Sequence, residues 1–145
     1  MQAIAVDRVD GASRGAKGAV AGMPRIWLRV EGMAALAAGV GLYLNLGGSL
    51  PWLVPLLLAV DVSMAGYLAG PRPGALVYNL VHNWAVGVGV LALAWWLGSP
   101  PVALAGAILV AHTGMDRVAG YGLKYPTAFA DTHLGRLGRP RGAGR

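Results

Sequence analysis

The sequence predicts an all-α integral membrane protein, a four-helix bundle whose helices run up, down, up and down. Of the 145 residues, 56% are hydrophobic and only 12% are charged, about half of the charged fraction usual in soluble domains. Four apolar stretches are each long enough to cross a bilayer, which takes about 20 residues of helix. The links between them are short, so neighbouring helices are expected to run antiparallel.

The apolar stretches predict four helices, and short turns rich in glycine and proline separate them. The expected helices span residues 27–46, 51–69, 74–97 and 101–120. Ser49 and Ser99 precede the second and fourth helices, where a hydroxyl can cap free N–H groups ahead of a proline in the first turn. The middle link, residues 70–74, is a third tight turn.

The remaining residues flank this transmembrane domain, which is predicted to span 25–135. Residues 1–24 are expected to form a flexible tail without the continuous apolar run of a signal peptide. Met23 is an alternative start to Met1. Residues 121–135 are expected to lie at the membrane interface, followed by a basic C-terminal tail over 136–145.

The basic residues predict the orientation. All twelve lie near the start of the first helix, in the middle link, or from the end of the fourth helix onward, and the two Gly-Ser-Pro turns carry none. By the positive-inside rule, the chain is a multi-pass protein of the bacterial inner membrane with both termini cytoplasmic. The net charge of +6 indicates contact with anionic membrane lipids. No nucleic-acid partner is expected, because the sequence shows no folded basic module.

Ionisable side chains interrupt the apolar helices, at a cost of several kcal/mol each unless they are paired or hydrated. Five of these ionisable residues are expected to be catalytic, and all five lie in the cytoplasmic half of their helices. They are Glu31, Asp61, His82, His112 and Asp116. They would supply metal ligands or an acid/base pair at one intramembrane pocket. The alternative is a hydrogen-bonded network that only holds the helices together.

The spacing of four of these residues suggests an internal repeat. Glu31 and Asp61 lie 30 residues apart, as do His82 and His112, and an offset of 51 relates the first pair to the second. This pattern favours two pseudo-symmetric helical hairpins related by an axis along the membrane normal. Each helix would then contribute one polar group to a central pocket.

The same residues form a candidate metal site. His112 and Asp116 are four apart and so share one helix face. With His82 and Asp61 they offer nitrogen and oxygen ligands that suit a divalent ion such as zinc, iron or manganese. An acid/base pair without metal is the alternative. With no cysteine in the chain, thiolate zinc sites and iron–sulfur clusters are excluded.

Residues near the end of the fourth helix are candidates for substrate binding. Arg117 and Lys124 would hold an anionic head group, and Tyr121 and Asn79 complete the expected set. The segment after the fourth helix is either an aromatic anchor at the interface or a lid that folds back over the pocket.

Several motifs resemble a bacterial family of four-helix integral membrane proteins known only as a domain of unknown function. The resemblance covers about residues 29–135. Its motifs are Arg29-Val30-Glu31-Gly32, Asp61 to Tyr67, Gly70-Pro71-Arg72, Tyr78 to His82, Ala111 to Arg117, Gly120 to Pro126 and Asp131 to Gly135. The resemblance implies the four-helix layout and no particular activity.

Three functions remain open on the sequence. The first is a membrane-embedded enzyme that acts on a lipid or another apolar small molecule, although the sequence has neither Gly-x-Ser-x-Gly nor His-Glu-x-x-His. The second is an ion- or proton-coupled binding or transport protein, which would need a homo-oligomer to form a conduction path. The third is a structural or assembly subunit of a larger membrane complex.

Overall fold

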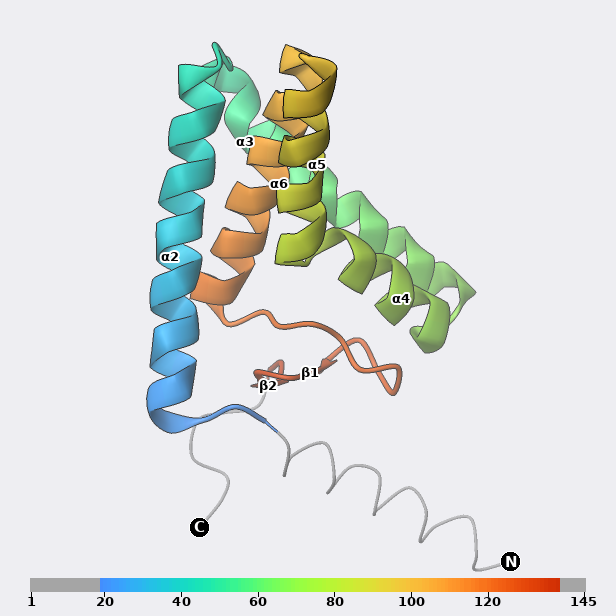
Figure 1. The fold of residues 1–145 in the computed structure, drawn as a ribbon. Helices are drawn as coiled ribbons and strands as arrows, with labels where there is room; N and C mark the ends of the chain where they lie inside the picture. Colours follow the sequence, from blue (N-terminus) through green and yellow to red (C-terminus); the bar gives the residue numbers. More distant parts are fainter. Residues whose placement is uncertain (1–18, 139–145) are drawn as a thin grey trace, which may run out of the picture.

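The computed structural model describes residues 19–138, which are mostly helical (Figure 1). Most of both predicted tails therefore lies outside the described residues. The elements in chain order are α2 (Gly22–Asn45), α3 (Leu50–Ala59), the 3-10 helix η1 (Val60–Ala69), α4 (Pro71–Val81), α5 (Trp84–Leu97), α6 (Pro100–Ala119), β1 (Asp131–Thr132) and β2 (Gly135–Arg136).

Three helical segments are long and apolar enough to cross a membrane. They are α2, the continuous pair α3–η1, and α6. The pair α4–α5 would be a fourth span, bent by 45° at its break. The prediction of a mostly helical protein with membrane-spanning segments is confirmed at this level.

The third predicted helix, over residues 74–97, is two helices instead of one. Asn83 separates them because its backbone is extended and its side-chain oxygen accepts a hydrogen bond from the Val86 N–H at 3.1 Å. Its amide nitrogen donates to the Asn79 carbonyl at 2.7 Å. Asn83 therefore ends α4 and caps α5, as asparagine commonly does at a helix N-terminus.

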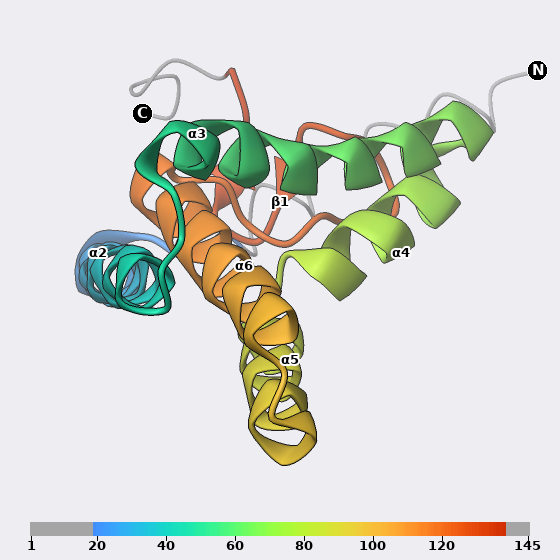
Figure 2. The ribbon, with the colours of Figure 1, turned by 90° about the horizontal axis from the view of Figure 1, so that it is seen from above.

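The regular packing of the four-helix up-down-up-down bundle that the sequence predicts is not confirmed. Helix α6 packs against both α2 and α5, whereas η1 packs along α4. In the view from above, η1 and α4 form a hairpin that projects sideways, away from α2 (Figure 2). The bend between α4 and α5 gives the hairpin its different direction.

Glycines bring α2 and α6 close together. A Cβ atom on Gly39 would lie 2.6 Å from the backbone nitrogen of Ala111, and one on Gly114 would lie 2.5 Å from that of Leu36. Small residues allow this approach of helix backbones in membranes, where van der Waals packing takes the place of the hydrophobic effect. Tyr43 and Ile108 lie buried in the core beside this contact.

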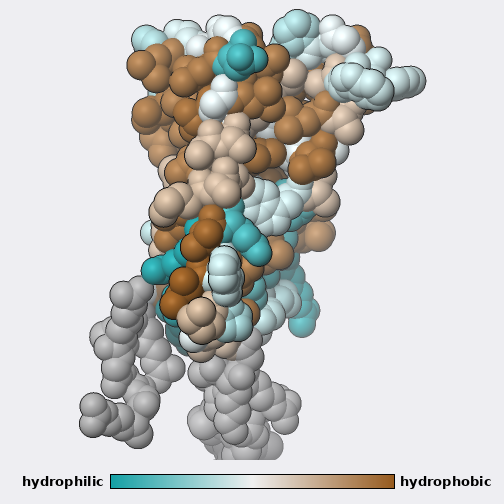
Figure 3. All heavy atoms as spheres, turned by 60° about the vertical axis from the view of Figure 1, so that its left-hand side comes forward, coloured by the Kyte–Doolittle hydropathy of each residue, from teal (hydrophilic) through white to brown (hydrophobic). Residues whose placement is uncertain are grey.

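Apolar side chains cover most of the upper part of the face drawn in Figure 3, and hydrophilic ones gather lower on it. Many large apolar residues are exposed, among them Leu68, Trp95 and Trp96. Such a surface suits a lipid environment, since contiguous exposed apolar patches are rare on soluble monomers.

The chain that follows α6 closes the lower end of the helices. Gly120 ends α6 with a positive φ of 93°. The short strands β1 and β2 pair antiparallel, and Lys124 forms an isolated bridge with Thr132. The Val20 N–H donates to the His133 carbonyl at 2.9 Å, which ties this segment to the start of α2.

The close α2–α6 contact predicts that two alanine substitutions on one helix differ in their effect on stability. Gly39→Ala should lower the free energy of unfolding by about 1–3 kcal/mol, because the three atoms nearest to its Cβ would all be backbone atoms of α6. Gly41→Ala is the matched control, since its Cβ would meet nothing within 4 Å. Thermal unfolding in detergent measures both. Equal losses of stability in the two variants would contradict the packing described here.

A candidate metal centre at the helix break

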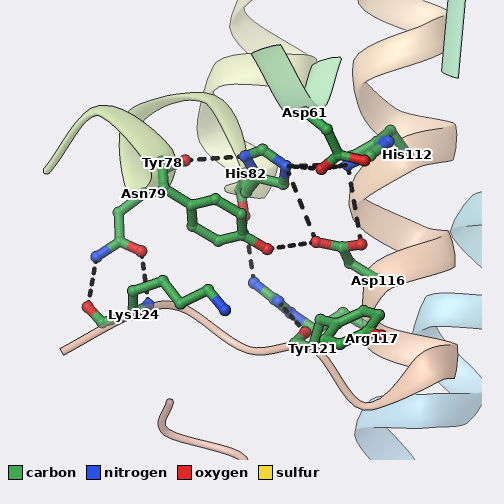
Figure 4. Close-up of polar contacts among 9 residues, drawn as sticks. All are labelled: Asp61, Tyr78, Asn79, His82, His112, Asp116, Arg117, Tyr121 and Lys124. Atoms are coloured by element: carbon green, nitrogen blue, oxygen red, sulfur yellow. Dashed lines mark hydrogen bonds and ion pairs between the residues drawn. The ribbon is translucent and has the colours of Figure 1, made fainter. Parts of the chain in front are cut away.

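Three side chains from separate elements converge beside the break between α4 and α5. The ligand atoms of Asp61, His82 and His112 all lie within 4.8 Å of one another. The two imidazole Nε2 atoms are 2.9 Å apart, and the Asp61 Oδ1 atom lies 3.5 Å from each of them. Together with Asp116 they form what we call the His–Asp cluster (Figure 4).

Each element places its residue for a local reason. His82 occupies the C-cap of α4, where the helix has already ended. Asp61 lies in the first turn of η1. His112 and Asp116 occupy one face of α6, four residues apart, as their spacing predicts.

Hydrogen bonding fixes the tautomer of His82. Its Nδ1 atom lies 3.0 Å from the carbonyl oxygen of Tyr78, which can only accept, so Nδ1 carries the proton. The ring also stacks on that of Tyr78, with centroids 3.7 Å apart and an interplanar angle of 11°. In the neutral imidazole, Nε2 therefore presents its lone pair to the cluster, as a metal-binding histidine does.

Asp116 is held against both histidines by a tyrosine. Its oxygens lie 3.9 Å from His82 Nε2 and 3.8 Å from His112 Nε2. The Tyr78 hydroxyl donates to Asp116 Oδ2 at 2.5 Å. Tyr78 was missed as a functional residue in the sequence, although its position four residues before His82 places both on one helix face.

The cluster has the donors and spacings of a metal site. Metal–nitrogen bonds are about 2.0–2.1 Å long, so an ion bound to nitrogens 2.9 Å apart would hold them at an angle of about 90°. Two imidazoles and two carboxylates suit zinc, iron or manganese. Asp61 is the open side of the cluster, since 31% of its side chain is exposed while both histidines are fully buried.

Glu31 is not part of the His–Asp cluster. It is exposed on α2, whereas its neighbour Gly32 is buried against Arg117 of α6. Adjacent residues on a helix point about 100° apart, so the glycine contact turns the carboxylate away. The predicted internal repeat relates Glu31 to Asp61, His82 and His112 by offsets of 30 and 51 residues. These four residues do not surround one centre, because Glu31 lies apart from the other three.

The expected substrate-binding residues mostly hold the closing segment in place. Arg117 donates from Nη1 to the Tyr121 carbonyl at 2.8 Å and from Nη2 to the His82 carbonyl at 3.3 Å. Asn79 donates to the Lys124 carbonyl at 2.9 Å and accepts from the Lys124 N–H at 2.7 Å. Tyr121 contributes its backbone, and its side chain is exposed.

The side chain of Lys124 is buried and extends beneath the Tyr78 ring (Figure 4). Its ammonium lies 5.0 Å from the centroid of that ring and 4.1 Å from that of Phe129. Burial lowers the pKa of Lys124, and the carboxylates of Asp116 and Asp61 partly oppose this. The segment thus brings a cation up to the cluster, as the lid hypothesis expects.

The third histidine of the chain makes the closing segment sensitive to pH. His133 Nδ1 accepts a hydrogen bond from the Leu123 N–H at 2.9 Å, which requires an unprotonated Nδ1. Burial, followed by the charge of Arg117, lowers the pKa of His133 below its ordinary value of 6.5. The folded segment therefore binds a proton less readily than the detached one, and its stability falls as the pH drops below 6.5.

His133→Asn should remove this pH dependence, because an asparagine oxygen can accept the same hydrogen bond without titrating. We expect the melting temperature of the wild type to fall relative to that of the variant as the pH is lowered from about 8 to about 5. Parallel thermal unfolding of the two proteins in detergent measures the difference. A constant difference across this range would contradict the assigned role of His133.

Comparison with known proteins identifies a family. A family model described as a domain of unknown function, DUF4260, matches residues 25–137. No curated protein and no solved structure matches the chain. The resemblance to an uncharacterised domain family over about residues 29–135 is confirmed, and the match assigns no chemistry to the His–Asp cluster.

Proposed function

This chain belongs to the DUF4260 family, a domain of unknown function, and from the geometry of its own residues we propose that it is a metal-dependent membrane enzyme. Its substrate would be a lipid or another small amphiphilic molecule. The observation that carries the proposal is the convergence of the Asp61, His82 and His112 ligand atoms within 4.8 Å.

The charges of the two carboxylates in the His–Asp cluster favour a bound cation over a hydrogen-bonded network with a purely structural role. Among residues 19–138, neither Asp61 nor Asp116 forms an ion pair with an arginine or lysine. Two carboxylates in a largely buried site are costly unless a positive charge compensates them. A divalent ion at the Nε2 atoms would supply that charge and use the lone pair that His82 already presents.

The position of the cluster suggests access from the membrane. Asp61 is partly exposed on η1, in the hairpin that projects sideways from the other helices. With both termini on the cytoplasmic side of a bacterial inner membrane, as the charge distribution predicts, the cluster would face the cytoplasmic leaflet. An amphiphile in that leaflet could bring its polar group to Asp61 while its apolar part stays in lipid.

The arrangement provides the parts for metal-assisted chemistry. A bound divalent ion polarises a substrate oxygen or lowers the pKa of a bound water toward neutrality. Asp116 lies within 4 Å of both histidines and is oriented by the Tyr78 hydroxyl. It is therefore the residue best placed to accept a proton from a group bound at the centre.

Metal content tests the proposal. Purified wild-type protein should retain about one divalent ion per chain after dialysis, whereas the double variant His82→Asn, His112→Asn should retain almost none. Asparagine at position 82 can still donate to the Tyr78 carbonyl, so the fold of α4 is kept while the Nε2 ligand is lost. Elemental analysis of both proteins, with their melting temperatures, measures the effect.

Two further variants sharpen this test. His133→Asn is the matched control, because it removes the remaining histidine and should leave the metal content unchanged. Tyr78→Phe removes the hydroxyl that holds Asp116 and should weaken metal binding about 10- to 100-fold. Folded wild-type protein that binds none of zinc, iron or manganese would overturn the proposal.

The interrupted helix favours one other candidate, an ion- or proton-coupled carrier. Broken helices are typical of ion sites in secondary transporters, and His82 lies at a helix break with a bend of 45°. In liposomes this candidate predicts metal or proton flux that His82→Asn abolishes and that requires no chemical turnover. Flux equal to that of empty liposomes would dismiss it.

A further inference from the structure

Lys124 has a buried side chain without a countercharge. Only 5% of the residue is exposed, and it forms no ion pair within the described part of the chain. Its ammonium lies over the faces of the Tyr78 and Phe129 rings. Such cation–π contacts offset only part of the cost of burying a charge.

The backbone of Lys124 is fixed from two sides. The side-chain amide of Asn79 pairs with both its N–H and its carbonyl, and Lys124 also forms a β-bridge with Thr132. These contacts hold the side chain beneath Tyr78, whose ring stacks on His82 and whose hydroxyl bonds Asp116 (Figure 4). The ammonium is therefore separated from the His–Asp cluster by little more than one aromatic ring.

The charges around the cluster leave room for an anion once metal is bound. A divalent ion would compensate the two negative charges of Asp61 and Asp116, with which neither Arg117 nor Lys124 forms an ion pair. The buried side chains of Arg117 and Lys124 would then carry two positive charges that no ion pair within residues 19–138 compensates. A group with two negative charges at the cluster would restore neutrality.

We propose that Lys124 binds the phosphate group of an amphiphilic substrate and holds it against the metal at the His–Asp cluster. The inference rests on the proposed function and adds the class of substrate, a phosphate monoester or diphosphate with an apolar tail. A phosphate monoester carries about −1.5 to −2 at pH 7, and lysine is a common phosphate ligand. The exposed apolar side chains of Leu68, Leu76 and Leu80 on η1 and α4 would lie along the tail.

The lowered pKa of Lys124 agrees with this role, because a bound phosphate would supply the negative charge that favours the ammonium form. A structural role alone predicts a different result. If the lysine serves only to pack against Tyr78 and Phe129, its replacement should change stability and leave the affinity for phosphate unaffected.

Binding of short-chain lipids to metal-loaded protein in detergent tests the proposal. The probes are dioctanoyl phosphatidic acid, dioctanoyl glycerol and inorganic phosphate, followed by calorimetry. Lys124→Met should weaken binding of phosphatidic acid about 10- to 100-fold, the loss expected for one charge-assisted hydrogen bond. Lys124→Arg should retain most of the affinity. Arg72→Met is the matched control, because it removes an exposed positive charge on α4 and should change the affinity less than about twofold.

The three probes distinguish the sources of the phosphate. Phosphatidic acid that binds more tightly than both other probes supports a lipid phosphate, and inorganic phosphate that binds as tightly points to a free anion at the same lysine. Equal binding of phosphatidic acid by Lys124→Met and wild type would overturn the proposal. So would equal binding of the phosphorylated and neutral lipids by wild type.

Amine labelling provides a second measurement on the unaltered chain, in case Lys124→Met does not fold. The chain has two lysines, Lys17 and Lys124, so Lys17 is an internal reference. Phosphatidic acid should slow acetylation of Lys124 relative to Lys17, as read by mass spectrometry, and dioctanoyl glycerol should not. Unchanged labelling would contradict the proposal. Repeating the assay with a chelator separates the two claims. Protection of Lys124 reports on phosphate binding alone, whereas the metal content of the purified protein tests the metal centre.

Discussion

The arrangement of the polar groups depends on one interruption of backbone hydrogen bonding, at His82 and Asn83. Asn83 caps α5 and bonds back to Asn79, so α4 stops and a new helix starts at a different angle. Backbone polar groups freed inside a membrane must find partners within the protein. Arg117 supplies one of them by donating to the His82 carbonyl. The same break places the His82 ring against His112 and directs α4 sideways along η1.

The closing segment belongs to the same network. The Asn79 side chain pairs with the Lys124 backbone, and Arg117 joins the His82 carbonyl to that of Tyr121. The helix break, the His–Asp cluster and the chain after α6 therefore support one another. This coupling explains why a short segment with only two two-residue strands lies in a defined position beneath the helices.

Much of the candidate site could be predicted from ionisable residues in apolar helices, which are costly and so need a reason. Asp61, His82, His112 and Asp116 were all expected, and they do meet. Glu31 was expected with them and lies elsewhere, because the glycines that pack α2 against α6 turn its carboxylate outward. Tyr78 was missed, because a tyrosine in an apolar helix has many roles and its bond to Asp116 links residues 38 positions apart.

The amino-acid sequence by itself determined which segments are apolar enough for a membrane, and which ionisable residues lie within them. Both are local properties of the sequence, so the lengths of the apolar segments can be compared with the roughly 20 residues of a membrane-spanning helix without knowledge of packing. The tertiary structure alone decided that the third predicted helix is bent, that η1 and α4 lean away from the other helices, and that the Lys124 side chain is buried beneath Tyr78. Those features depend on the angles at which the helix backbones approach one another. Close glycine contacts between residues far apart in the chain set some of these angles, and the cap of α5 by Asn83 sets the bend.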